Sequence, residues 1–197
     1  MSRTTVTTLD EVGQALVQAA SDLLATDGAA ALTVRAIATA AGASTMNVYS
    51  RFGGKDGVVE QLYLQGFELL ATEMRSGGIT ADPLADLQRC GQAYRRFALQ
   101  HSTLYAVMFS RAVPDYEPTA KAKAFGLRTL DDLADRLQRA MDAGLLRPID
   151  ADHAAAIVWS TCHGVMSLEL AHPEGTPVDW ERVFADATAT VMKGLAA

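Results

Sequence analysis

Apolar residues recur every three or four positions along most of this chain, which is the spacing of an amphipathic helix. Alternating runs rich in Val, Ile and Thr, which would indicate strands, are missing, and alanine is frequent throughout. The pattern predicts an all-α fold. In the first helix one stripe holds Leu9, Val12, Leu16, Ala19, Ala20, Leu23 and Leu24.

Turn and cap residues divide this pattern into separate helices. Gly28 suits the end of the first helix, and Thr33 and Ser44 can cap the second and third. Asp82 followed by Pro83 is the expected order at a helix start. The predicted helices span about 9–27, 33–41, 44–52, 56–76, 83–100, 101–110, 117–143, 150–171 and 178–193.

The segment from Gly28 to Lys55 differs in charge from the rest of the chain. The net charge of −6 argues against a protein that coats nucleic acid all over. Between Gly28 and Lys55, however, the charged residues are Arg35, Arg51 and Lys55, all positive. A small basic surface on an acidic body can bind DNA. A neutral subdomain with three solvated charges would show the same pattern.

Three positions within this segment have the spacing of a helix-turn-helix. Ala38 leaves room for a crossing helix, Gly42 supplies the turn, and Val48 packs back between the two helices. This arrangement leaves the second helix free to enter a major groove. Alone the spacing is a weak signal in an alanine-rich chain.

The whole stretch LTVRAIATAAGASTMNVYSRFGGKDGVVEQLY, from Leu32 to Tyr63, resembles the DNA-binding domain of the TetR family of transcriptional regulators. That family shows the pattern G-x-x-x-LT-x-x-x-IA-x-x-AGVS-x-x-x-x-Y-x-x-F-x-x-K-x-x-L. Ala43 replaces its valine, a valine at 58 or 59 replaces its leucine, and Arg51 stands where histidine is frequent. The matching residues are Gly28, Leu32, Thr33, Ile37, Ala38, Ala41, Gly42, Ser44, Tyr49, Phe52 and Lys55.

The second part of the chain is similar to one TetR subgroup. HSTLYAVMFS, at 101–110, resembles its H-P-x-LY-x-LMF segment with Ser102 in place of proline, and Trp159, His163 and Gly164 match its Trp–His–Gly region. The resemblance implies a homodimer with a DNA-binding head and a ligand-binding body. We therefore expect a DNA-binding domain at 1–54, a linking helix at 55–78 and a ligand-binding and dimerisation domain at 79–197.

The resemblance places the DNA contacts at the start of the third helix and around it. Asn47 can contact an adenine or a phosphate, and Met46 a thymine methyl group or nothing. Thr33 and Ser44 are equally well explained as helix caps. The Ser2–Thr4 arm could enter a minor groove or be a disordered tail. The candidate DNA-binding residues are Thr33, Arg35, Ser44, Thr45, Met46, Asn47, Tyr49, Arg51 and Lys55.

The body carries large apolar side chains but few obvious convergent charges, which predicts a largely apolar, neutral ligand held by one or two hydrogen bonds. For each side chain, core packing is the alternative. His163 could bind the ligand or join two helices, and Gly164 beside it, which would permit close helix approach, favours the second. The candidate ligand-binding residues are Phe67, Met74, Tyr94, Phe97, His101, Tyr105, Met108, Phe109, Phe125, Trp159, His163 and Met166.

The last two predicted helices are the expected homodimer contact, although their apolar stripes could instead face the chain's own core. One stripe holds Ala155, Val158, Cys162, Val165 and 168–170; the other holds Val183, Phe184, Ala187, Val191 and Leu195.

Other classes of protein find little support in the sequence. Cys90 and Cys162 form no C-x-x-C motif, and no catalytic or phosphate-loop motif occurs, so we expect no enzyme, metal or cofactor. No secretory signal or apolar run of membrane-spanning length is evident, so we expect a cytoplasmic protein. The resemblance implies a repressor that binds a double-stranded DNA operator as a homodimer and is released by a small-molecule effector. Because each chain has one recognition motif, we expect the operator to be palindromic. A ligand-binding protein of the same fold that no longer reads DNA and a helical enzyme are the alternatives.

Overall fold

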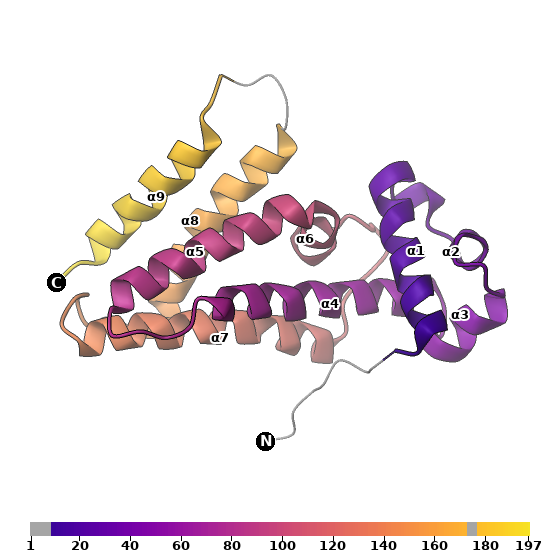
Figure 1. Cartoon of the computed structure of the whole chain (residues 1–197), viewed down its shortest axis with the longest axis horizontal. Helices are drawn as coiled ribbons and strands as arrows, with labels where there is room; N and C mark the ends of the chain where they lie inside the picture. Colours follow the sequence, from indigo (N-terminus) through magenta and orange to yellow (C-terminus); the bar gives the residue numbers. More distant parts are fainter. Residues whose placement is uncertain (1–8, 173–176) are drawn as a thin grey trace. The chain divides into compact units, whose positions relative to one another are not determined.

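The computed structural model describes residues 9–172 and 177–197, so the Ser2–Thr4 arm lies outside the described residues. Within these ranges the fold is all-α, as predicted, and holds no strand (Figure 1). The helices are α1 (Glu11–Asp27), α2 (Val34–Ala40), α3 (Thr45–Phe52), α4 (Lys55–Ser76), α5 (Pro83–Gln100), α6 (Ser102–Phe109), α7 (Ala120–Asp142), α8 (Ala151–Ala171) and α9 (Trp180–Leu195). A short 3₁₀ turn, Ala29–Ala31, follows α1.

The chain folds into two compact units that are not continuous in sequence. The first combines Met1–Leu69 with His101–Gly126, and the second combines Leu70–Gln100 with Leu127–Ala197. Helices α4 and α7 therefore each contribute to both units. The boundaries of these units differ from those of the predicted domains 1–54, 55–78 and 79–197. The predicted domains are defined by function and remain a prediction.

In the first unit α1, α2 and α3 pack around a small apolar core (Figure 1). Leu16 from α1, Ile37 from α2 and Val48 from α3 have no exposed surface. Ala38 is also buried, and Gly42 turns the chain between α2 and α3 with φ +63°, a conformation that glycine adopts without strain. The predicted helix-turn-helix is therefore present, with α3 as its second helix.

The rest of the first unit packs α6 and the start of α7 against α4. A Cβ added to Gly66 of α4 would lie 2.5 Å from the Met108 sulfur of α6, so this glycine permits their close approach. Glu60 of α4 accepts hydrogen bonds from the backbone N–H of Thr119, at 3.1 Å, and from its hydroxyl, at 2.9 Å. These contacts join α4 to the segments on both sides of the α6–α7 loop.

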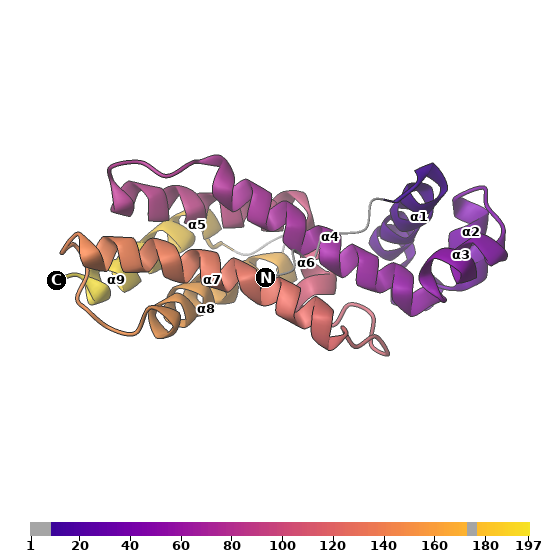
Figure 2. The same ribbon diagram turned by 90° about the horizontal axis from the view of Figure 1, so that it is seen from below.

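The second unit is a helical bundle with its own core (Figure 2). Leu137 and Ala140 of α7 are fully buried together with Ala154 and Ala155 of α8. The C-terminus closes this core, because the backbone N–H of Arg147 donates to the carbonyl of Leu195 at 2.9 Å. By length and composition alone α8 could span a membrane, and 28% of its most apolar window is buried. A single helix that meets this criterion is weak evidence for a membrane span.

Most helices begin where the sequence predicts, and the differences have local causes. The Thr33 hydroxyl caps α2 by accepting from the Ala36 N–H at 3.1 Å. Ser44 occupies the N-cap position of α3 but makes no capping bond. The seventh helix begins at Ala120 rather than Glu117, because the Thr119 hydroxyl accepts from the Ala122 N–H at 3.2 Å and caps it.

Five positions of the predicted dimer stripes are buried in the chain's own core. This is the alternative that the sequence left open, and it removes those positions from any contact with a second chain. The buried members are Ala155, Cys162, Val165, Phe184 and Leu195.

Candidate functional site

One face of α3 presents large side chains to solvent. Met46 is 70% exposed and Tyr49 is 55% exposed, although both are apolar enough to be buried by a typical core. Thr45 beside them is also exposed, while Val48 on the opposite face anchors the helix. The helix is therefore held from behind and free to contact a partner in front.

A chain of side-chain hydrogen bonds connects this face to the start of α1. The Arg51 guanidinium donates to both Asp10 carboxylate oxygens, at 3.0 and 2.7 Å, and to the Asn47 side-chain oxygen at 2.7 Å. The Asn47 amide nitrogen donates to the Ser44 hydroxyl at 3.1 Å. Arg51 was predicted as a phosphate ligand, but its guanidinium is engaged with Asp10 and Asn47.

Asp10 contacts this face of α3 but is not among the residues predicted from the sequence. It caps α1 by accepting from the Gly13 N–H at 2.8 Å while it binds Arg51. The Arg51 hydrogen bond, followed by the Gly13 N–H, lowers the pKa of Asp10 to about 2. The cap was readable from the sequence, but the pairing across 41 residues has no local signal.

The remaining predicted DNA contacts surround α3. Arg35 is exposed on α2, and Lys55 is the first residue of α4, where the free backbone N–H groups of a helix start favour a phosphate. Thr33 is exposed but serves as the α2 cap. Arg35 is thus an exposed cation of the helix-turn-helix, and Lys55 directly follows that motif in sequence.

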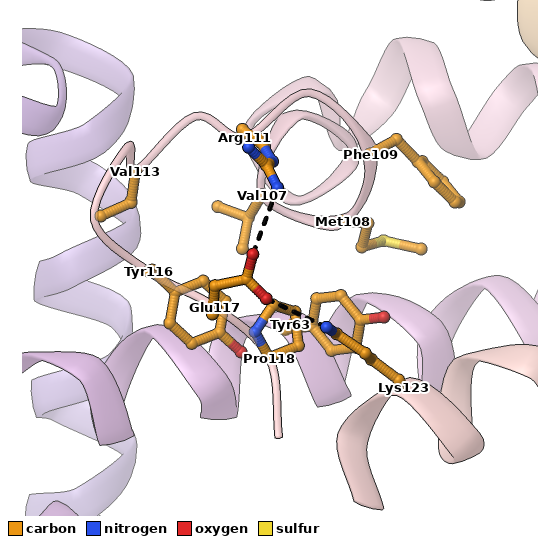
Figure 3. A pocket seen from close by; sticks show the side chains of 10 residues that line it. All are labelled: Tyr63, Val107, Met108, Phe109, Arg111, Val113, Tyr116, Glu117, Pro118 and Lys123. Atoms are coloured by element: carbon orange, nitrogen blue, oxygen red, sulfur yellow. Dashed lines mark hydrogen bonds and ion pairs between the residues drawn. The ribbon is translucent and has the colours of Figure 1, made fainter. Parts of the chain in front are cut away.

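A pocket of about 270 Å³ opens in the first unit between α4, α6 and the loop that joins α6 to α7 (Figure 3). Its deeper wall is apolar and aromatic: Tyr63, Val107, Met108, Val113 and Tyr116 are each at most 8% exposed. The lining residues are Tyr63, Val107, Met108, Phe109, Arg111, Val113, Tyr116, Glu117, Pro118 and Lys123.

The mouth of the pocket carries three charged side chains. Glu117 bridges Arg111, at 3.2 Å, and Lys123, at 3.0 Å, and all three are largely exposed (Figure 3). Lys123, followed by Arg111, lowers the pKa of Glu117. The carboxylate is thus already paired with both cations, and the three groups together carry one net positive charge.

Tyr116 lies in the loop between α6 and α7 yet is buried. Burial is the main cause that raises its pKa and that of Tyr63 above their ordinary value, so both phenols are neutral at physiological pH. The buried Tyr116 hydroxyl makes no hydrogen bond within the described residues. The two rings are 6.5 Å apart in an edge-on contact. The pocket therefore has a buried hydroxyl without a hydrogen bond beside its apolar wall.

The structure separates the predicted ligand-binding residues into two groups. Met108 and Phe109 line the pocket, and Phe67 and Tyr105 pack on Phe109 at ring distances of 5.4 and 4.9 Å. His101 and Phe125 also belong to the first unit. The other predicted residues belong to the second unit: Met74, Tyr94, Phe97, Trp159, His163 and Met166.

In the second unit His163 joins two helices. Its Nδ1 lies 3.3 Å from the Tyr94 hydroxyl of α5, its Nε2 lies 3.3 Å from the Ser167 hydroxyl, and Trp159 stacks at 5.3 Å. Burial lowers the pKa of His163, which favours the neutral imidazole. Gly164 does not serve the predicted close approach, because it is exposed and a Cβ there would meet nothing within 4 Å among the described residues.

Several pocket residues had no signal in the sequence. Val113, Tyr116 and Pro118 lie in a segment bracketed by prolines, which reads as a solvated loop, and periodicity predicts no burial there. The ion pair of Arg95 and Glu169, at 2.6 Å between α5 and α8, was also not expected. No group of three or more His, Cys, Asp or Glu that could hold a metal occurs in 9–172 and 177–197.

The fold and the exposed α3 define a helix-turn-helix DNA-binding protein with a helical body. Residues 16–62 match the family described as bacterial regulatory proteins, tetR family, and residues 87–191 match the tetracyclin repressor-like C-terminal domain. The second match alone covers more than half of the chain. The chain therefore belongs to the TetR family of transcriptional regulators.

Solved structures share the fold along nearly the whole chain. A protein of unknown function from a Rhodococcus species aligns with a TM-score of 0.82 and 24% identity over 97% of this chain and 98% of that one. PfmR, a TetR family regulator from Thermus thermophilus, gives 0.73 and 23% over 92% and 99%. SmeT in complex with triclosan gives 0.74 and 21% over 95% and 93%. No curated protein matches the chain significantly.

Proposed function

We propose that this chain is a cytoplasmic transcriptional repressor that binds a palindromic operator as a homodimer and is released by a small, largely apolar ligand. The observation that carries the proposal is that α4 extends from the helix-turn-helix to the pocket. This helix begins with Lys55 beside α3 and lines the pocket with Tyr63, about 12 Å further along its axis. One rigid element thus links a phosphate contact to a ligand site.

The operator follows from the number of reading helices. Each chain carries one helix-turn-helix, and one recognition helix contacts only a few base pairs. A two-fold dimer places two such helices in major grooves about 34–36 Å apart, or a multiple of that distance. Lys55, Arg35 and Tyr49 contact phosphates or base edges, and Met46 contacts a thymine methyl group.

The last two helices supply the dimer contact, through positions that the chain leaves uncovered. Although α8 is apolar, most of its window is not buried within one chain. Leu168 is 53% exposed, Val183 of α9 is 37% exposed, and the exposed Gly164 allows close helix approach. A second copy can cover this surface, which we call the α8–α9 face and define by Gly164, Leu168 and Val183.

The pocket suits a ligand with an apolar body. The buried wall of Tyr63, Met108 and Tyr116 offers no charge, and the charged groups at the mouth are paired with one another. The Tyr116 hydroxyl supplies one hydrogen bond to orient the ligand. Triclosan bound to SmeT is an example of a small molecule held by this fold.

Release of DNA follows from the ligand's preference between two states. A ligand wedged between α4 and α6 favours the conformation in which they lie apart, and it weakens DNA binding by that preference and no more. No step requires catalysis, so the proposal assigns the protein no enzymatic activity.

Selection of duplexes from a random library, followed by fluorescence anisotropy, tests DNA binding. We expect an enriched two-fold symmetric site with an affinity that falls steeply as salt rises. Lys55→Ala should weaken binding to all duplexes alike, because phosphates carry no base identity, whereas Lys121→Ala on the exposed side of α7 should not. A library that shows no enrichment would contradict the proposal and favour a ligand-binding protein that no longer reads DNA.

Thermal shift with sets of neutral, cationic and anionic compounds of equal hydrocarbon size tests the pocket. We expect neutral compounds to raise the Tm and to release the selected duplex. Met108→Ala, which enlarges the pocket, should change the order of preferred compounds before it weakens DNA binding, and Met192→Ala in the second unit is the control. Stabilisation by anions alone would contradict the apolar ligand.

A further inference from the structure

The hydroxyl of Tyr116 is buried and lacks a hydrogen bond. Tyr116 is 8% exposed, and its phenolic oxygen has no partner within the described residues. Among the residues that line the pocket, it is the one with such an atom in the described part of the chain. A buried hydroxyl without a partner destabilises the arrangement that holds it. An arrangement that brings a partner to this oxygen is therefore favoured by the new contact.

A second buried tyrosine shows the usual outcome. Tyr94 of α5 is 5% exposed, and its hydroxyl lies 3.3 Å from Nδ1 of His163. The same residue type at the same degree of burial thus has a partner in the second unit. Buried polar side chains are paired in most structures, so the unpaired Tyr116 hydroxyl requires an explanation.

The surroundings of Tyr116 suit the hydrocarbon part of a ligand. Tyr63, Met108 and Val113 line the same pocket and are buried, and none of them carries a charge. Figure 3 shows the Tyr116 ring at the edge of this wall, with its oxygen on the side of Pro118. An apolar molecule that fills the pocket would therefore lie next to one unpaired hydroxyl.

The chemistry of the phenol selects the ligand group that pairs with it. Burial, followed by the nearby Glu60 carboxylate, raises the pKa of Tyr116, so the phenol keeps its proton and has an O–H to donate. A ligand N–H would leave that donor unpaired, whereas a carbonyl or ether oxygen accepts from it. A ligand carboxylate also accepts, but it would place a charge against an apolar wall. A neutral acceptor fits best.

The loop that carries Tyr116 can move at small cost. Because the hydroxyl is buried, a ligand reaches it only when the α6–α7 loop shifts. The outer side of this loop is tied by the ion pairs of Glu117 with Arg111 and Lys123, and all three groups are largely exposed. Exposed ion pairs contribute little to stability. The loop therefore permits the shift that the contact requires.

We propose that the effector is a neutral molecule with a carbonyl or ether oxygen on a hydrocarbon body, and that Tyr116 selects it by donating a hydrogen bond to that oxygen. This inference rests on the proposed function, because it takes the pocket as the effector site. It adds the chemical class of the effector and the direction of the hydrogen bond. A hydrocarbon of the same size fills the same wall without this contact.

The test compares two probes with one carbon skeleton, the ketone α-tetralone and the hydrocarbon tetralin. Isothermal titration calorimetry measures the Kd of each probe for the full wild-type chain, for Tyr116→Phe and for Tyr94→Phe. Phenylalanine retains the ring and removes the hydroxyl. Tyr94→Phe is the matched control, because it removes a hydroxyl of similar burial from the other unit. The ratio of the two Kd values isolates the contribution of the ketone oxygen.

We expect the ratio of the tetralin Kd to the α-tetralone Kd to fall at least about fivefold in Tyr116→Phe, the effect of one hydrogen bond. Tyr94→Phe should leave this ratio unchanged. Without a probe, Tyr116→Phe should keep the wild-type Tm, because the hydroxyl that it removes is unpaired. Tyr94→Phe should lower the Tm, because it removes the contact with His163.

An unchanged ratio in Tyr116→Phe would overturn the inference, although binding of both probes would still support the pocket. A lower Tm of Tyr116→Phe without a probe would overturn it too, because the hydroxyl would then be bonded within the chain. An equal fall of the ratio in Tyr94→Phe would show that the effect does not come from the pocket. If neither probe binds the wild-type chain, the pocket is not the effector site, and that part of the proposed function fails together with this inference.

Discussion

Asp86 is a carboxylate without exposed surface in its side chain, and four donors surround it in the second unit. It accepts from the Thr80 N–H at 2.9 Å, from the Thr80 hydroxyl at 2.7 Å and from Arg139 at 3.1 Å, and it contacts Arg89. The two Thr80 bonds are the largest causes that lower its pKa to about 2. The carboxylate thus ties the α4–α5 loop to α5 and α7.

This arrangement gives stability a defined pH dependence. A carboxyl whose pKa is lower in the folded state stabilises the fold above its unfolded pKa, near 4, and that stabilisation is lost as the pH falls through about 2. Asp86→Asn should therefore lower the Tm at pH 7 by about 5 °C or more. The difference from wild type should narrow between about pH 4 and pH 2. Differential scanning calorimetry across this range measures it.

Asp135→Asn, on the exposed side of α7, is the matched control and should change the Tm little at any pH. A gap between wild type and Asp86→Asn that stays constant from pH 7 to pH 2 would show that the hydrogen bonds survive protonation, and would contradict the role given to the charge.

At the scale of single residues the sequence predicts what depends on near neighbours. Thr33 was expected as a cap and is one, because its partner is three residues away. Asp10 and Arg51 meet across 41 residues, and Glu60 meets Thr119 across 59, so no local pattern could pair them. The orientation of the Asn47 amide was out of reach for the same reason, because Arg51 lies on it only while Asp10 holds Arg51.

At the scale of elements, the helix boundaries follow from turn and cap residues. Gly42 and the Asp82-Pro83 pair mark boundaries that the structure confirms, since turns and caps are local devices. Periodicity was less informative on where each helix faces. Helices α8 and α9 carry apolar residues on the side that faces the core and also on part of the exposed side. The sequence pattern therefore did not distinguish positions buried within the chain from positions left for a second chain.

The pocket was predictable only in part, because one part of its wall lies on a helix and the other part lies in a loop. Met108 and Phe109 lie on a helix whose apolar character is evident, and both line the pocket. The wall that completes it comes from the α6–α7 loop, where burial of Tyr116 depends on the packing of that loop and not on any repeat. Function located in loops escapes periodicity in general.

At the scale of the whole molecule, dimer formation depends on the exposed α8–α9 face. Leu168→Glu places a charge in the α8–α9 face, where it would be desolvated by a second copy, and it should convert a dimer to a monomer without unfolding it. Sedimentation velocity at micromolar concentration measures the change. DNA affinity should fall together with the dimer, because each half-site then binds alone.

Val191→Glu is the informative comparison. Val191 packs against the core of the second unit, so a charge there should lower the Tm as well as disturb assembly. A wild-type chain that sediments as a monomer, or a Leu168→Glu chain that remains a dimer, would place the contact elsewhere than on the α8–α9 face.

The discontinuous first unit limits how this regulator can be recombined. Its DNA-binding helices share their unit with residues 101–126, and α6 packs against both α1 and α4. A chimera that joined residues 1–69 to a foreign body would leave Gly66 without its Met108 neighbour and α1 without α6. A chimera that exchanges the DNA-binding unit must therefore transplant two segments of sequence, 1–69 and 101–126. One continuous N-terminal segment would not carry the whole unit.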